Sequence, residues 1–116
     1  MTTNIGNLTG SSHVRMGSTF TVRDDIDTFS KMATVLEVRG KILFIRYDSP
    51  GSSRPFYGTG RITHNYLGDE TIMPDPIRSL GIFNLTDAYE KYRTMVEIHE
   101  DLTRIREFDK QLTLKK

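Results

Sequence analysis

Arginines and aromatic residues are interleaved through the middle of the chain, and these residue types together suggest a binding chemistry. They are Arg46, Arg54, Arg61, Tyr47, Phe56, Tyr57 and Tyr66. Guanidinium groups contact phosphates and carboxylates, while aromatic faces stack on bases or on cations. We predict that these seven residues, together with Asp25, form a partner-binding surface.

The charge distribution fits a local binding surface better than a generally basic protein. The 116 residues include 16 basic and 15 acidic side chains, which gives a net charge of +1. Between residues 31 and 61, six cationic residues are opposed by only two acidic ones. A patch of this size favours a protein partner first and nucleic acid second.

Residue types used in catalysis or metal binding occur here without the spacing that their chemistry requires. The chain has no cysteine, which excludes disulfides, thiolate metal sites and a Cys nucleophile. His13, His64 and His99 lack metal-ligand spacing, and no calcium-loop pattern follows the acidic stretch 24–27. The glycine pair in YGTGRI leads into a strand, whereas a phosphate loop leads into a helix. We therefore predict a non-enzymatic protein without metal or cofactor.

The elements that position the arginines and aromatics have the pattern of a small β-rich domain. Strands are predicted at residues 14–22, 32–38, 41–47, 56–57 or 61–67, and 71–73. Gly58 and Gly60 are expected at a bulge or bend. Four or five short strands favour an SH3-like barrel over residues 14–80, preceded by a flexible arm at 1–13.

The last quarter of the chain changes to a helical pattern. Apolar residues recur three or four positions apart from Leu85 to Leu112, without an intervening Gly or Pro. Asn84 or Thr86 can cap the start. We predict one C-terminal helix over 84–112, of about 25 residues and about 37 Å. A helix this long on a small domain also fits a homodimer formed through it.

The strand at 41–47 is apolar on both faces. If Leu43 and every second residue after it point into the barrel, Ile42 and Phe44 lie on the outside. Two large apolar side chains side by side are unfavourable on an exposed strand. We predict that the helix starting at Leu85, or a partner subunit, covers them.

The segment ATVLEVRGKILFIRYDSPGS resembles the central hairpin of Tudor-type barrels, especially malignant-brain-tumour repeats. VRMGSTFTV lies where such repeats have their first strand, so the resemblance covers about residues 14–66. It implies a methyl-lysine pocket, in which aromatic faces and one carboxylate hold the ammonium group. The implied cage residues are Tyr47, Asp24 or Asp25, and Phe56 or Tyr57. Pro50 stands where the family typically has Trp, and the chain contains no Trp.

The sequence therefore predicts a single α+β domain that acts as a binding module or adaptor. It would engage a protein or nucleic-acid partner through the basic, aromatic-rich face of the barrel. The alternative is an interaction or inhibitor protein that acts through the C-terminal helix and a dimer surface. No apolar run reaches the ~20 residues of a membrane span, and the N-terminus lacks a signal-peptide pattern. A cytoplasmic or other intracellular location without a membrane partner is expected.

Overall fold

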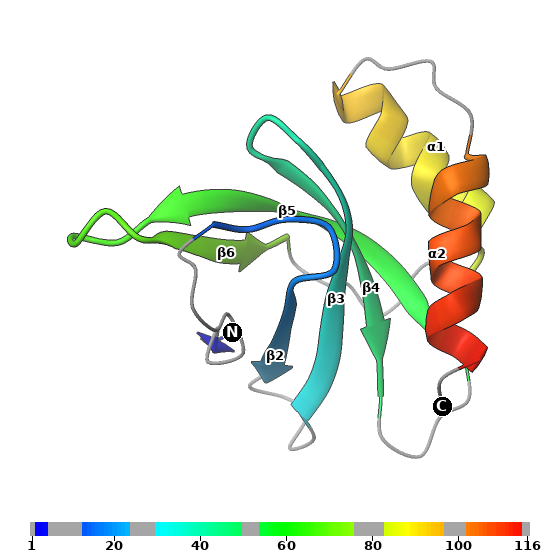
Figure 1. Cartoon of the computed structure of the whole chain (residues 1–116), viewed down its shortest axis with the longest axis horizontal. Helices are drawn as coiled ribbons and strands as arrows, with labels where there is room; N and C mark the ends of the chain where they lie inside the picture. The colour runs from blue at the N-terminus through cyan, green and yellow to red at the C-terminus, as the bar shows by residue number, and fades with distance from the viewer. Residues whose placement is uncertain are drawn as a thin grey trace.

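A bent antiparallel β-sheet, covered on its outer face by two helices, forms the body of the protein (Figure 1). The structure is a computed structural model that describes residues 2–4, 13–23, 30–49, 54–75, 83–96 and 102–114. The predicted α+β class is confirmed, and the sheet is barrel-like. Across the described ranges, every helix is too short or too polar to cross a membrane.

The sheet contains six strands in sequence order, each antiparallel to the next. They are β1 (Thr2–Asn4), β2 (Thr19–Arg23), β3 (Ser30–Arg39), β4 (Ile42–Asp48), β5 (Phe56–His64) and β6 (Glu70–Pro74). Within the predicted arm 1–13, β1 pairs with β2, and residues 5–12 lie outside the described ranges.

Two glycines explain where the observed strands differ from the predicted ones. β2 begins at Thr19 and not at Val14, because Gly17 has a φ of 93° and ends the extended pattern. β5 is one continuous strand, whereas a break was expected near its glycines. A Cβ on Gly60 would lie 2.8 Å from Cδ1 of Ile45, so glycine lets β4 and β5 pack closely there.

The inner face of the sheet encloses an apolar core. Its members are Val14, Phe20, Val22, Ala33, Val35, Leu43, Ile45, Tyr47, Phe56, Ile62 and Ile72. Alternation along β4 places Leu43, Ile45 and Tyr47 inside, as predicted. Phe44 consequently points outward, yet its exposed fraction is 0% because a second layer covers it.

A β-bulge in β3 prepares the outer face for this second layer. One extra residue, Leu36, lies between the pairs Val35–Ile45 and Glu37–Phe44. A bulge lets two consecutive side chains turn to the same side. Leu36 therefore joins the outer apolar cluster, and Glu37 meets the second helix.

The second layer consists of α1 (Leu85–Val96) and α2 (Thr103–Leu114). Their buried side chains are Ala88, Tyr89, Tyr92 and Ile105. The rings of Tyr89 and Tyr92 contact Phe44, with centroids 5.7 and 5.2 Å away. The side chain of Asn84 caps α1 by accepting the N–H of Asp87. Helices of the same chain thus cover the outer face of β4.

The prediction of one helix over 84–112 is wrong, because the segment forms two helices. The longest dimension of the whole molecule is 36 Å. A straight helix of about 37 Å would be as long as this dimension, so its end would extend past the sheet that it covers. Two shorter helices place Tyr92 and Ile105 in the same cluster. Residues 97–101, between them, lie outside the described ranges.

The β5–β6 hairpin extends away from the helices and forms an arm of the molecule (Figure 1). Its turn comprises residues 65–69, between the paired residues His64 and Glu70. The hydroxyls of Thr63 and Thr71 lie 2.6 Å apart across the two strands and add a side-chain link to the backbone pairing.

Candidate functional site

The eight predicted binding residues divide into a buried group and an exposed group. Arg46, Tyr47, Phe56 and Tyr57 are all less than 9% exposed. Arg54, Arg61 and Tyr66 are exposed, and Asp25 lies outside the described residues. These side chains therefore do not form one continuous surface, and their binding role stays a prediction.

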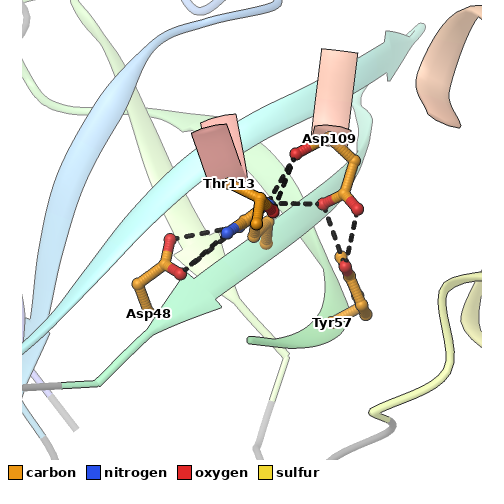
Figure 2. Close-up of polar contacts among 5 residues, drawn as sticks. Asp48, Tyr57, Asp109 and Thr113 are labelled. Carbon is orange, nitrogen blue, oxygen red and sulfur yellow. Dashed lines mark hydrogen bonds and ion pairs between the residues drawn. The ribbon is translucent and has the colours of Figure 1, made fainter. Parts of the chain in front are cut away.

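Arg46 is fully buried, and its guanidinium joins β4 to α2. Figure 2 shows its partners Asp48, Asp109 and Thr113 together with Tyr57. Arg46 Nη1 donates to the Asp109 carboxylate at 2.8 Å, the Asp109 carbonyl at 2.7 Å and the Thr113 hydroxyl at 2.9 Å. Its Nε and Nη2 donate to Asp48 at 3.1–3.3 Å. The Tyr57 hydroxyl lies 2.9 Å from both Asp109 carboxylate oxygens and donates to them. We call these five residues the Arg46 cluster.

Electrostatics fix the protonation states in the Arg46 cluster. Burial by itself would lower the pKa of Arg46, but hydrogen bonds to Asp48 and the charge of Asp109 outweigh burial and raise it. Burial, followed by the hydrogen bond to Asp109, raises the pKa of Tyr57. Arg46 is thus a fixed cation and Tyr57 a neutral donor. A phosphate could reach this guanidinium only by displacing carboxylates that already hold it.

A second polar contact lies between the bulge of β3 and α2. Arg104 donates to Glu37 Oε1 at 3.0 Å, and Arg39 donates to the same oxygen at 3.2 Å. The side chain of Glu37 is only 5% exposed. Tyr92 lies near this carboxylate, and burial followed by the charge of Glu37 raises the pKa of the Tyr92 hydroxyl. Both polar contacts between the sheet and α2 are thus charged and close to the outer apolar cluster.

Two of the three rings that the Tudor resemblance offers for a cage, Tyr47 and Phe56, are stacked on each other, and the third, Tyr57, belongs to the Arg46 cluster. Tyr47 and Phe56 have centroids 5.0 Å apart and planes at 16°. Rings in contact leave no space between them for an ammonium group, and both belong to the inner core. Outside this core, the Arg54 guanidinium lies 4.7 Å from the Phe83 ring centroid. This arginine therefore makes a cation–π contact within the chain.

The tip of the β5–β6 arm combines apolar exposure with a fixed backbone. Tyr66 is 95% exposed and Leu67 is 69% exposed. The side-chain oxygen of Asn65 accepts the N–H groups of Leu67 and Asp69 at 2.9 and 3.0 Å. Gly68, with a φ of 88°, donates its N–H to the Asn65 carbonyl at 3.0 Å. The turn therefore holds both apolar side chains outward.

Next to this tip, Glu70 connects the arm to the segment before β2. Its Oε1 accepts the Val14 N–H at 2.6 Å and lies 3.7 Å from His13 Nδ1. Its Oε2 lies 3.9 Å from His64 Nε2. In the part of the chain that the structure describes, no three His, Cys, Asp or Glu side chains are grouped to hold a metal ion. The acidic stretch 24–27 and His99 lie outside that part.

Three residues that shape the candidate site were not predicted from the sequence. Asp109 and Glu37 were absent from the predicted site residues, although Glu37 interrupts the alternation of ATVLEV and so marks the bulge. Leu67 was placed at the end of the predicted strand 61–67 and not in a binding surface. Its signal was its place beside Tyr66 between two turn formers, Asn65 and Gly68, because a tight turn points its central side chains into solvent.

Comparison with known proteins gives no relative: no family model, curated protein or solved structure matches this chain.

Proposed function

We propose that this chain is a non-enzymatic binding module and that the β5–β6 arm engages a protein partner. The observation that carries the proposal is the pair Tyr66 and Leu67, held outward at the arm tip. Exposed apolar side chains on a fixed turn gain free energy when a partner removes them from water. Tyrosine is also enriched among residues that dominate binding energy.

The outer face of the arm extends this surface toward the body. Arg61 and Met73 are paired across the two strands and both are exposed. A stable interface buries about 800 Å² per partner, more than two side chains supply, so these neighbours are expected to contribute. Of the basic, aromatic-rich face predicted from sequence, Arg61 and Tyr66 thus form the part that a partner can reach on the arm. The SH3-like and Tudor-like assignments stay predictions.

The alternative is an interaction through the helices and a dimer surface. Most apolar residues of α1 and α2 that would serve it pack against the sheet of the same chain, and Met95 and Leu114 are the exposed exceptions among the described helix residues. The arm is therefore the stronger candidate. Lys91 and Glu107 are exposed on α1 and α2, so they allow the two surfaces to be compared in one experiment.

The test compares two tagged double variants with the wild-type chain in extracts of the source cells. Tyr66→Ser with Leu67→Ser is expected to reduce recovery of a specific partner about tenfold or more, because two anchors are lost. Lys91→Glu with Glu107→Lys is expected to leave recovery unchanged. The opposite pattern, in which only the helix variant loses the partner, would refute the proposal and support the alternative.

A further inference from the structure

The arm tip also carries an acidic side chain, to which the proposed function gives no role. Asp69 is exposed and follows the two apolar residues in the sequence, with Gly68 between them. Its backbone N–H donates to the side-chain oxygen of Asn65, and this hydrogen bond fixes the position of its backbone. An apolar pair and one carboxylate are thus held together on a single short turn.

We propose that Tyr66 and Leu67 enter an apolar socket of a folded protein and that a Lys or Arg on the rim of this socket pairs with Asp69. This inference rests on the proposed function and specifies its partner. A carboxylate next to two apolar anchors matches a cation at the edge of an apolar pocket. At the edge, solvent lowers the desolvation cost, so the ion pair mainly contributes orientation and specificity.

The acidic residue argues against a lipid surface or nucleic acid as the occupant. Anionic headgroups and phosphates would be repelled by the exposed Asp69, whereas the Glu70 carboxylate is already engaged by the Val14 N–H, His13 and His64. The cation Arg61 lies three residue pairs behind His64–Glu70, about 10 Å along the strand. The turn residues 65–69 contain no Lys or Arg, so a lysine or arginine that pairs with Asp69 is expected from the partner.

The geometry of the turn argues for a socket and against a flat surface. The turn that carries the two side chains lies at the end of the projecting β5–β6 hairpin (Figure 1), and both side chains are exposed there. Four hydrogen bonds within residues 65–69 fix the turn before any partner arrives. An anchor that is already ordered loses less conformational entropy on binding.

Photo-crosslinking in source cells tests the inference. The full chain carries p-benzoylphenylalanine at Tyr66, and a control chain carries it at the exposed Lys91. We expect a protein adduct at Tyr66 in clear excess over the control. Mass spectrometry should place its attachment point in an apolar pocket bordered by Lys or Arg. An attachment point on a flat or acid-bordered surface would overturn the socket.

The second measurement is a binding titration. The partner protein that the crosslink identifies is purified in its free form and titrated with variants of this chain. Leu67→Ser is expected to weaken binding about 30-fold, and Asp69→Lys about fivefold or more. Asn65→Ala should also weaken binding although it removes no apolar group, since it loosens the turn. Lys91→Ala is the control and should bind as wild type. All these positions are exposed, and unchanged thermal unfolding verifies the fold.

The outcomes separate the two proposals. If Tyr66 gives no specific adduct, or if the captured protein binds Leu67→Ser as tightly as wild type, both fail. If Tyr66 crosslinks to a protein but Asp69→Lys binds equally or more tightly, binding through the arm stands and the basic rim is refuted. Two further assays use phosphatidylcholine–phosphatidylglycerol vesicles and a generic oligonucleotide. If the wild-type chain sediments with the vesicles or shifts the oligonucleotide, and Leu67→Ser does not, the protein socket is overturned.

Discussion

The Arg46 cluster predicts that one buried ion pair contributes strongly to holding α2 on the sheet. The perturbation is Asp109→Ala, which removes the carboxylate that accepts from Arg46 and from Tyr57. The backbone carbonyl of residue 109 and the Thr113 hydroxyl remain as acceptors for the guanidinium. The variant thus leaves a buried cation with one carboxylate partner, Asp48.

The size of the effect follows from burial. The Arg46 side chain is 0% exposed, and that of Asp109 is 15% exposed. Removing one member of a buried ion pair costs about 3–5 kcal/mol, because the other charge stays out of water. Asp48 still compensates part of the charge, so we expect about 3 kcal/mol, the lower end of that range. This is a large share of the 5–15 kcal/mol typical of a domain.

Equilibrium unfolding in urea, followed by circular dichroism, measures this loss. With a slope of about 1.5 kcal/mol per molar urea, a loss of about 3 kcal/mol lowers the midpoint by about 2 M. Glu107→Ala, at an exposed position of the same helix, is the control and should change stability by less than about 0.5 kcal/mol. If Asp109→Ala unfolds at the same urea concentration as this control, the cluster does not hold α2. In the double variant Arg46→Met, Asp109→Ala, the losses should fall short of additive by about 2 kcal/mol.

Three further predictions concern buried groups. Tyr57→Phe should cost about 1.5 kcal/mol in urea unfolding because it removes a hydrogen bond to a carboxylate. Tyr47→Phe should be neutral or stabilising, because the buried Tyr47 hydroxyl has no hydrogen-bond partner among the described residues. Equal losses in the two variants would contradict this. Gly60→Ala should cost about 1–3 kcal/mol of stability, since its added Cβ would lie 2.8 Å from Cδ1 of Ile45. Gly58→Ala should cost less, since its Cβ would lie 3.3 Å from the Tyr47 ring. The reverse order of the two losses would refute the reasoning. Burial raises the pKa of Tyr47 and Tyr57 above 10.0, so the unfolded chain loses these protons first. Stability should be unaffected by these groups below about pH 10 and fall as pH rises above it. Urea midpoints at increasing pH test this, and the double Phe variant should show a smaller fall.

Alternation in the sequence predicted the two faces of β4, and the need to cover Phe44 indicated that something packs over it. The covering helical segment could be predicted because helical periodicity and the Asn84 cap depend only on residues close to one another in the sequence. The break between α1 and α2 could not, because neither Gly nor Pro marks it. It depends on how much sheet is available to cover, which is a property of the folded molecule.

The candidate site was predicted less completely, for a similar reason. Arg46 looked like a surface residue because its partner Asp109 lies 63 positions later in the chain. Arginine identity says nothing about such a distant carboxylate. The exposure of Tyr66 followed from a local turn and was within reach of the sequence. Leu67 was missed because a lone apolar residue in a turn carries no periodic signal.

The covered outer face of the sheet has a consequence for biosynthesis. Residues 85–114 leave the ribosome after β6, and at about 5–20 residues per second they take about 2–6 seconds to appear. A sheet that forms before then displays Phe44 and Tyr57 without their cover. The nascent protein is therefore most prone to aggregation or chaperone binding in that interval, although all residues of its inner core have already been synthesised.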